Sequence, residues 1–241
     1  MRVIEFDDHL RVPASAVAFV SFSAADGEHT SCAPSWLAPA EAVYARGLAV
    51  PRRRAAWLAG RLAAKTAIAT LAPRATPPER TEILPAAGGE PVVRGAFSES
   101  GSPIDVSIAH SHGLAAAVAF ERRRTGAMGI DIEGRGQSID DALVDFAFSI
   151  EEAAAIGTPA DEEGRQLCLL RFWTAKEAVL KAVRRGLRLP LSAVRLRWTD
   201  LDGPMGASVQ CAPDACVPFD VMAIRSPGHV VSVAIEAAHA R

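Results

Sequence analysis

The sequence predicts an α+β fold that is a pseudo-dimer of two similar halves. Stretches with apolar residues every three or four positions, typical of helices, alternate with stretches in which every second residue is apolar, typical of strands. An internal repeat adds to this pattern, because residues 63–68 are similar to 174–179 and residues 113–120 are similar to 228–235. The two matches have nearly the same spacing. We therefore expect an N-terminal half over 1–124 and a C-terminal half over 125–241, joined near 121–127.

The first half contains two predicted helices. A short one opens at residues 38–41, where Pro39 suits a first turn. A longer one runs from about Ala55 to Leu71 and is stopped by Pro73. The predicted strands of this half cover residues 14–24, 81–84, 91–94, 104–111 and 114–120.

Cations line the margin of the apolar side of the longer helix. At the helical period, Arg61 and Lys65 lie close to the face of Trp57, and Arg53 lies two turns before Arg61. Cations in this position suit an anionic ligand held between the helix and its neighbour. An ordinary amphipathic helix with snorkelling side chains explains them equally well.

The second half opens with an acidic strand. Residues 128–134 alternate apolar and acidic, so Asp131 and Glu133 project from one face and Ile130 and Ile132 from the other. Adjacent carboxylates repel each other, and Mg²⁺ is the cation that such oxygen ligands suit. The alternative is an edge strand with a solvated acidic face.

A helix over residues 172–182 follows and is expected to end at Gly186. Lys176 falls within its apolar arc, where a lysine must snorkel or meet an anion. Glu177 and Lys181 are four apart and share a different face, which is also the spacing of an ordinary surface pair. Ser149 and Glu152 form a capping box, so we assign Glu151 and Glu152 a structural role. The remaining predicted strands cover residues 192–199, 206–211, 219–225 and 229–236.

Composition excludes several classes of protein. The 241 residues carry a net charge of −2 and 49% hydrophobic residues, which gives no reason to expect nucleic acid or a membrane as partner. The four scattered cysteines, of which Cys211 and Cys216 are five apart, lack zinc spacing. We expect them to be reduced in a cytoplasmic protein. No glycine-rich phosphate loop is present.

Two motifs carry a resemblance to a known family. Gly-Ile-Asp-Ile-Glu at 129–133 and Phe-Trp-Thr-Ala-Lys-Glu-Ala-Val-Leu-Lys at 172–181 resemble the paired signature of 4′-phosphopantetheinyl transferases. The length resembles the single-chain type that acts on acyl or peptidyl carrier proteins. The resemblance implies a monomeric, Mg²⁺-dependent enzyme with its active site in the cleft between the halves. Such an enzyme moves phosphopantetheine from coenzyme A to a carrier serine and releases adenosine 3′,5′-bisphosphate.

The resemblance also implies roles for individual residues. Asp131, Glu133 and Glu177 match the metal ligands of the family. Glu177, or a water that it orients, is the candidate base for the carrier serine, although the sequence does not decide which group takes the proton. Lys181 matches the lysine that meets the phosphates and could stabilise or protonate the leaving phosphate.

The first half would hold the nucleotide. Arg53, Arg61 and His110 match family residues that grip the 3′-phosphate of coenzyme A or lie beside the nucleotide. Two positions depart from the pattern. Glu90 stands where many relatives have a basic residue, and Ala109 stands where they have serine.

Residues 178–199 lack Asp and Glu but carry a series of cations. We expect part of this segment to steer an acidic carrier protein, with Leu187 and Leu189 as apolar anchors. A solvated helix end that complements the helix dipole accounts for Arg184 and Arg185 equally well. The basic residues of this segment are Lys181, Arg184, Arg185, Arg188, Arg195 and Arg197.

Two other functions are compatible with the motifs. One is a module that binds coenzyme A or a carrier without transfer, although such a module need not keep a metal triad. The other is a metal-dependent hydrolase of a nucleotide pyrophosphate, which would consume coenzyme A without a carrier.

Overall fold

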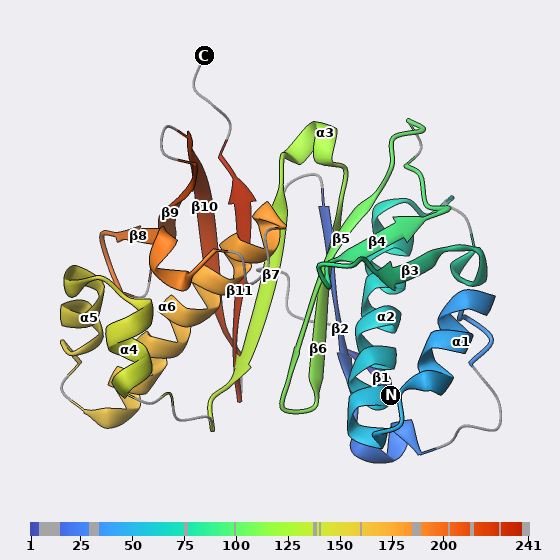
Figure 1. Cartoon of the computed structure of the whole chain (residues 1–241), viewed down its shortest axis with the longest axis horizontal. Coiled ribbons are helices and arrows are strands. Elements are labelled where there is room, and N and C mark those ends of the chain that lie inside the picture. Colours follow the sequence, from blue (N-terminus) through green and yellow to red (C-terminus); the bar gives the residue numbers. More distant parts are fainter. Residues whose placement is uncertain are drawn as a thin grey trace. The chain divides into compact units, whose positions relative to one another are not determined.

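The computed structural model divides into two compact units, Met1–Thr125 and Gly126–Arg241 (Figure 1). In each unit, a long helix packs on an antiparallel sheet. This arrangement confirms the predicted α+β class. None of the described helices is long and apolar enough to cross a membrane. The structure describes residues 1–4, 15–28, 34–74, 77–98, 100–136, 139, 141–159, 161–184, 189–201, 203–212, 215–226 and 228–237.

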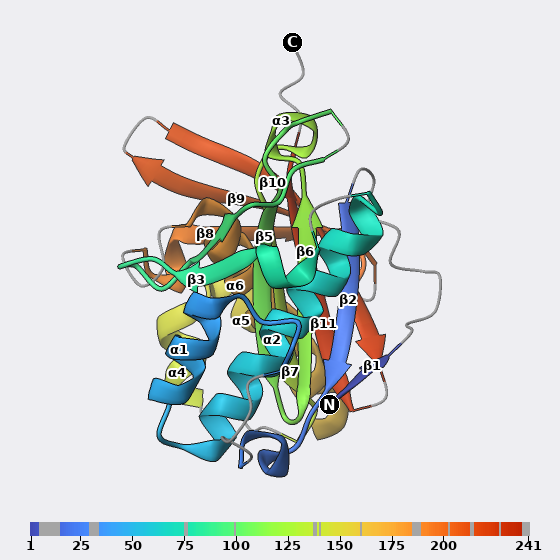
Figure 2. The ribbon, with the colours of Figure 1, turned by 90° about the vertical axis from the view of Figure 1, so that its right-hand side faces the viewer.

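The first unit is built on a sheet of order β1-β2-β6-β5. The long helix α2 packs on β2 and β6, as Figure 2 shows. It begins at Pro51, earlier than the expected Ala55, because proline is well suited to the first helical position. The strands of the unit are β1 (Arg2–Ile4), β2 (Ser15–Ser21), β3 (Glu82–Pro85), β4 (Pro91–Arg94), β5 (Asp105–Ser111) and β6 (Leu114–Phe120), and its helices are α1 (Pro39–Gly47), α2 (Pro51–Leu71) and α3 (Arg122–Thr125).

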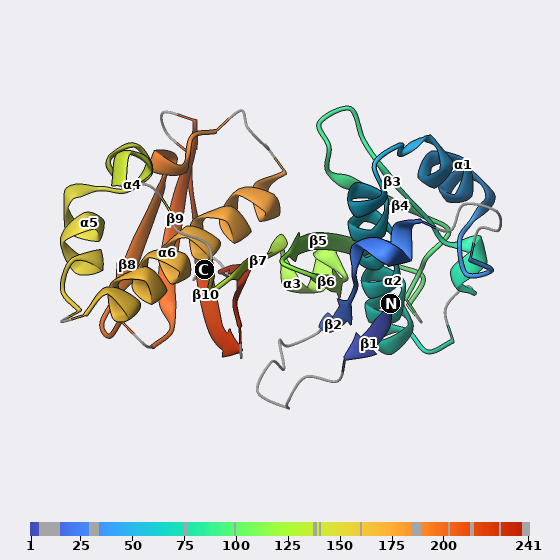
Figure 3. The same ribbon diagram turned by 90° about the horizontal axis from the view of Figure 1, so that it is seen from below.

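The second unit is built on a sheet of order β7-β11-β10-β9-β8. Helix α6 packs on it, and α5 packs against α6 (Figure 3). The strands are β7 (Met128–Gly134), β8 (Val194–Trp198), β9 (Met205–Ala212), β10 (Ala215–Ser226) and β11 (His229–Glu236), and the helices are α4 (Asp141–Ala147), α5 (Ile150–Ile156) and α6 (Glu162–Val183).

Helix α6 differs from its prediction at both ends. It begins at Glu162 behind an Asp161 cap, ten residues before the signature. It ends at Val183 rather than at Gly186, because Arg184 adopts a left-handed conformation with φ of 53° that closes the helix. Gly186 lies outside the described residues. Helix α4 was not predicted.

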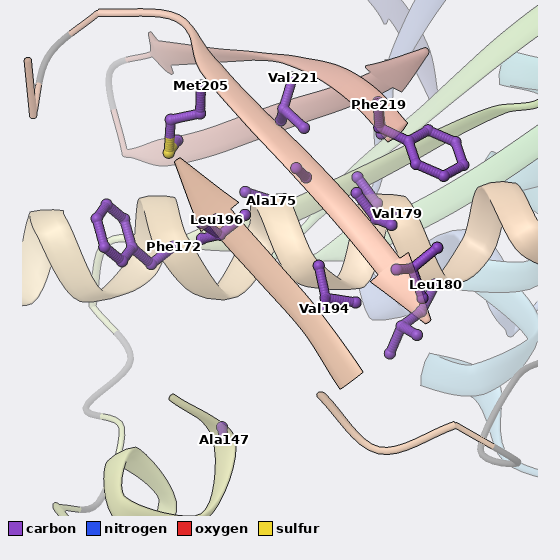
Figure 4. Close-up of a cluster of buried hydrophobic side chains, with 14 of the residues drawn as sticks. Ala147, Phe172, Ala175, Val179, Leu180, Val194, Leu196, Met205, Phe219 and Val221 are labelled. Carbon is purple, nitrogen blue, oxygen red and sulfur yellow. The ribbon is translucent and has the colours of Figure 1, made fainter. Parts of the chain in front are cut away.

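The core of the second unit lies between α6 and the sheet. Phe172, Ala175 and Val179 project from α6 toward the strands, as Figure 4 shows. Val194 and Leu196 meet them from β8, at every second position, as expected for a strand with one buried face. This packing accounts for the apolar face of the signature helix.

The two units repeat one order of elements. In each, a strand is followed by a long helix and then by a hairpin whose second strand pairs with the first strand. The registers agree: Ala18 of β2 pairs with Ala117 of β6, and Asp131 of β7 pairs with Ser232 of β11. The four positions are separated by 113 and 115 residues, close to the spacing of the sequence repeat.

A buried lysine–glutamate pair lies at the same place in both units. In the second unit, Lys176 Nζ lies 2.7 Å from Glu152 and donates to the carbonyls of Ala147 and Val194, each at 2.8 Å. Glu152 in turn accepts from the backbone N–H groups of Ser149 and Leu196. The prediction that Lys176 meets an anion is therefore confirmed, and so is the capping role of Glu152.

In the first unit, Lys65 Nζ lies 2.8 Å from Glu41 and donates to the carbonyls of Pro78 and Thr81. Glu41 accepts from the N–H groups of Ala38 and Ile83. Burial lowers the pKa of both lysines, while the glutamate partners act in the opposite direction. For Lys65, neither of the two alternatives left open by the sequence applies, because a buried carboxylate holds its ammonium.

Replacing either lysine with methionine should destabilise the protein, because it leaves a glutamate buried without its cation. We expect Lys176→Met and Lys65→Met each to lower the free energy of unfolding by about 3–5 kcal/mol in denaturant titrations. The control is Arg165→Ala, which removes a surface pair with Glu162 on α6 and should cost less than about 1 kcal/mol. Equal losses in the three variants would contradict the structural role.

Candidate active site

A glycine brings the signature helix onto the acidic strand. A Cβ atom on Gly129 would lie 2.0 Å from the carbonyl oxygen of Ala178 and 2.6 Å from the nitrogen of Ala182. Only glycine allows the backbones of β7 and α6 to approach so closely. A hydrogen bond of 2.7 Å between the Thr174 and Ser232 hydroxyls joins α6 to β11 nearby. The glycine of the first motif therefore sets the distance between strand and helix.

The face of β7 that carries Gly129 also carries Asp131 and Glu133, because side chains alternate along a strand. Asp131 is buried, and Lys181 reaches it from α6 with a hydrogen bond of 2.5 Å. Glu177 lies one turn before Lys181 on the same helix face. The structure thus gathers four of the predicted residues on one strand and one helix of a single unit.

Negative charge accumulates in this group, called here the acidic cluster (Asp131, Glu133 and Glu177). The pKa of Glu177 is raised, mainly by burial, and further by the charges of Asp131 and Glu133. Lys181 acts in the opposite direction on Glu177. The Lys181 ammonium bonds to Asp131 of the cluster, so the alternative of an ordinary surface Glu–Lys pair is wrong.

The donor set of the acidic cluster fits Mg²⁺, since it consists of carboxylate oxygens that repel one another. Within the described part of the chain, no three Asp, Glu, His or Cys side chains stand together as a finished metal centre. Here the Lys181 ammonium supplies positive charge to Asp131. Binding of a divalent ion would therefore require the side chains of the cluster to rearrange.

The first unit holds a second candidate site, a cavity of about 350 Å³ called here the arginine pocket. Arg53, Arg61 and His110, the three residues predicted for the nucleotide, all line it. Arg53 and His110 are exposed, whereas Arg61 is buried. Burial lowers the pKa of Arg61 to about 10, so its guanidinium stays charged at neutral pH. The full lining is Tyr44, Leu48, Arg53, Ala56, Trp57, Gly60, Arg61, Pro85, Gly89, Pro91, Ile108 and His110.

The two departures from the family pattern do not reach into this pocket. Gly89 and Pro91 line it, but Glu90 between them does not. The Glu90 carboxylate folds back against Gly88, within 2.4 Å of where a Cβ atom on Gly88 would be. Ala109 is buried and does not line the pocket either. Neither residue therefore places a charge or removes a contact at the cavity wall.

Sequence reasoning missed the aromatic wall of the pocket. The Tyr44 and Trp57 rings stack with centroids 5.1 Å apart, and the Arg61 guanidinium lies 4.5 Å from the Trp57 ring centroid. The spacing of Trp57 and Arg61, four apart on one helix, is the signal that could have indicated this contact. Nothing in the sequence pairs Tyr44 with them, because it comes from α1.

The segment expected to dock a carrier is described only in part. Arg184 caps α6, while Arg185, Leu187 and Arg188 lie outside the described residues. Arg195 and Arg197 are exposed on β8 and alternate with its buried residues. Their position is compatible with docking, which stays a prediction.

Replacing Gly129 with alanine should force α6 away from β7. We expect Gly129→Ala to lower the free energy of unfolding by about 1–3 kcal/mol, the usual cost of overpacking, measured by denaturant titration. Gly47→Ala is the matched control, because a Cβ atom there meets nothing within 4 Å. An equally stable Gly129→Ala protein would show that the close approach is not needed.

Comparison with known proteins finds a family resemblance in the second unit. Residues 127–234 match the family model described as the 4′-phosphopantetheinyl transferase superfamily. No curated protein matches the chain. The matched segment spans nearly all of the second unit and includes Gly129, the acidic cluster and Lys181. The second unit of the chain is thus similar to the 4′-phosphopantetheinyl transferase superfamily.

Proposed function

We propose that the protein transfers 4′-phosphopantetheine from coenzyme A to a serine of an acyl or peptidyl carrier protein, with Mg²⁺. The superfamily supports phosphopantetheinyl transfer and coenzyme A as its donor. The observation that carries the proposal is the contact of Lys181 with Asp131 inside the acidic cluster. This contact places a cation that suits phosphate oxygens beside carboxylates that suit a metal ion.

The proposed reaction is a displacement at phosphorus. The hydroxyl oxygen of the carrier serine attacks the phosphorus that bears the pantetheine group. The bond from that phosphorus to the bridging oxygen of the pyrophosphate breaks, and adenosine 3′,5′-bisphosphate leaves. Such reactions depend mainly on positioning and on neutralisation of charge rather than on covalent chemistry by the protein.

The cluster residues would divide the remaining tasks. Asp131, Glu133 and Glu177 would hold Mg²⁺, whose charge neutralises the pyrophosphate oxygens when it is bound. Glu177, or a water hydrogen-bonded to it, would accept the serine proton. The Lys181 ammonium would turn from Asp131 to the oxygens of the leaving phosphate, where developing negative charge favours it.

In the same proposal, the arginine pocket holds the nucleotide of coenzyme A. The cations of Arg53 and Arg61, with the imidazole of His110, suit the 3′-phosphate. The docking of an acidic carrier by Arg195 and Arg197 also remains part of this proposal.

Removing the charge of Glu177 should nearly abolish transfer. We expect Glu177→Gln to lower the rate at least about 10²-fold, the scale of electrostatic effects at such sites. The assay incubates the protein with coenzyme A, Mg²⁺ and an apo peptidyl carrier protein and measures carrier mass by intact mass spectrometry. Chelation of the metal should also stop the gain of one phosphopantetheine. Glu163→Gln, on the exposed part of α6, is the control and should keep full activity.

Other outcomes would favour the alternative functions. Coenzyme A binding without any carrier modification, over several apo carriers, would support a binding module. Consumption of coenzyme A without a carrier would support a hydrolase. Near-normal transfer by Glu177→Gln would exclude Glu177 as metal ligand and as base.

The role of the arginine pocket can be tested with the 3′-phosphate itself. We expect Arg53→Ala to raise the KM for coenzyme A by about 3- to 10-fold, because it removes an exposed charge-assisted contact. The KM for 3′-dephospho-coenzyme A should change little. The control is Arg52→Ala, an exposed neighbour that does not line the pocket. A similar rise for both substrates with Arg53→Ala would argue against a 3′-phosphate contact.

A further inference from the structure

The arginine pocket contains a buried cation, Arg61, whose terminal N–H groups are left to bind a ligand. Arg61 is only 7% exposed, yet among the described residues it forms no ion pair within 4 Å. Glu41, whose charge acts to raise the pKa of Arg61, is held by Lys65 and by two backbone N–H groups. Of the Arg61 nitrogens, Nε donates to the Ile83 carbonyl at 2.8 Å. The terminal nitrogens are therefore the part of the guanidinium that can serve an anion.

The plane of this guanidinium is set from two sides. The bond from Nε to Ile83 holds one edge, and the central carbon lies over the Trp57 ring, 4.5 Å from its centroid. A guanidinium recognises phosphate through paired donors in its own plane, so its orientation decides which oxygens it can reach. Stacking on tryptophan leaves that edge open, whereas a carboxylate partner would occupy it.

Packing alone does not explain a tryptophan at this position. The Trp57 Nε1 atom is buried and has no hydrogen-bond partner among the described residues, which is costly for an N–H group. Phenylalanine would supply an aromatic ring without an N–H group to bury. Tryptophan, however, provides the strongest ring surface for a cation.

The fold does not require this stack either. The second unit repeats the same helix, and 111 residues further along, the spacing of Lys65 and Lys176, the two positions hold Cys168 and Phe172. There Phe172 is buried in the core and packs on Trp198 with ring centroids 4.9 Å apart. The stack of tryptophan and arginine is thus specific to the unit that has the arginine pocket.

We propose that Trp57 is a positioning residue that holds the Arg61 guanidinium in the plane needed to bind the 3′-phosphate of the coenzyme. The inference rests on the proposed function of the pocket and adds a residue that acts through Arg61. Tyr44, stacked on Trp57, supports the ring from α1. Loss of the ring surface weakens phosphate binding without removing any group that touches the reacting atoms.

The test compares two nucleotides that differ by one phosphate. Isothermal titration of the whole protein measures the Kd for adenosine 3′,5′-bisphosphate and for adenosine 5′-monophosphate. We expect Trp57→Leu to raise the first Kd by roughly 2- to 30-fold, the range of cation–π contributions, and Trp57→Phe to restore part of the loss. The second Kd should stay the same. In transfer assays, KM for coenzyme A should rise while kcat is kept.

A double-mutant cycle shows whether Trp57 acts through Arg61. In an Arg61→Ala background, Trp57→Leu should add no further loss. Trp36→Phe is the control, because Trp36 packs against the same small apolar cluster but does not line the pocket. An additive loss in the cycle, or an equal loss for both nucleotides, would overturn the proposal. Failure of the unmodified protein to bind either nucleotide would instead overturn the function proposed for the pocket.

Discussion

Each of the two units depends on a buried ion pair between a lysine and a glutamate. In the second unit, Lys176 and Glu152 join α5, α6 and the start of β8, and their hydrogen bonds within the described part of the chain run to each other or to the backbone. Buried charges persist only when they are paired and hydrogen-bonded in this way. The pair fixes the rotation of α6 about its axis. Since Glu177 is the next residue, the same contact decides where the acidic cluster can form.

One scaffold therefore carries two different sites. The pairing register and the helix spacing place Ala18 and Val20 where the second unit has Asp131 and Glu133. The positions of Glu177 and Lys181 are taken by Thr66 and Thr70, so the first unit has no acidic cluster. Conversely, Phe172 takes the place of Arg61. The shared pair is structural, and the residues around it differ between the two units.

Sequence reasoning reached the parts of the site that local patterns encode. Alternation along β7 and helical spacing along α6 placed the acidic residues on matching faces, and the motifs supplied their chemistry. It did not reveal that Lys181 bonds to Asp131 or that Glu41 holds Lys65, because those partners are 50 and 24 residues apart. Such contacts depend on how elements pack, as does the stack of Tyr44 on Trp57. The early start of α6 was missed because residues 162–171 lack the signature.

The repeat has a consequence for the interpretation of variation in this chain. Residues of the shared strand, long helix and hairpin have counterparts in the other unit, beside a different candidate site. Where the two counterparts are identical, as with Lys65 and Lys176, sensitivity to substitution reports on folding. Where the two counterparts differ, as with Arg61 and Phe172, sensitivity to substitution reports on a role that is specific to one unit. In a saturation mutagenesis survey of this protein, each variant in one unit could be compared with the variant at the equivalent position of the other unit. Effects on stability could then be separated from effects on activity without a second homologue.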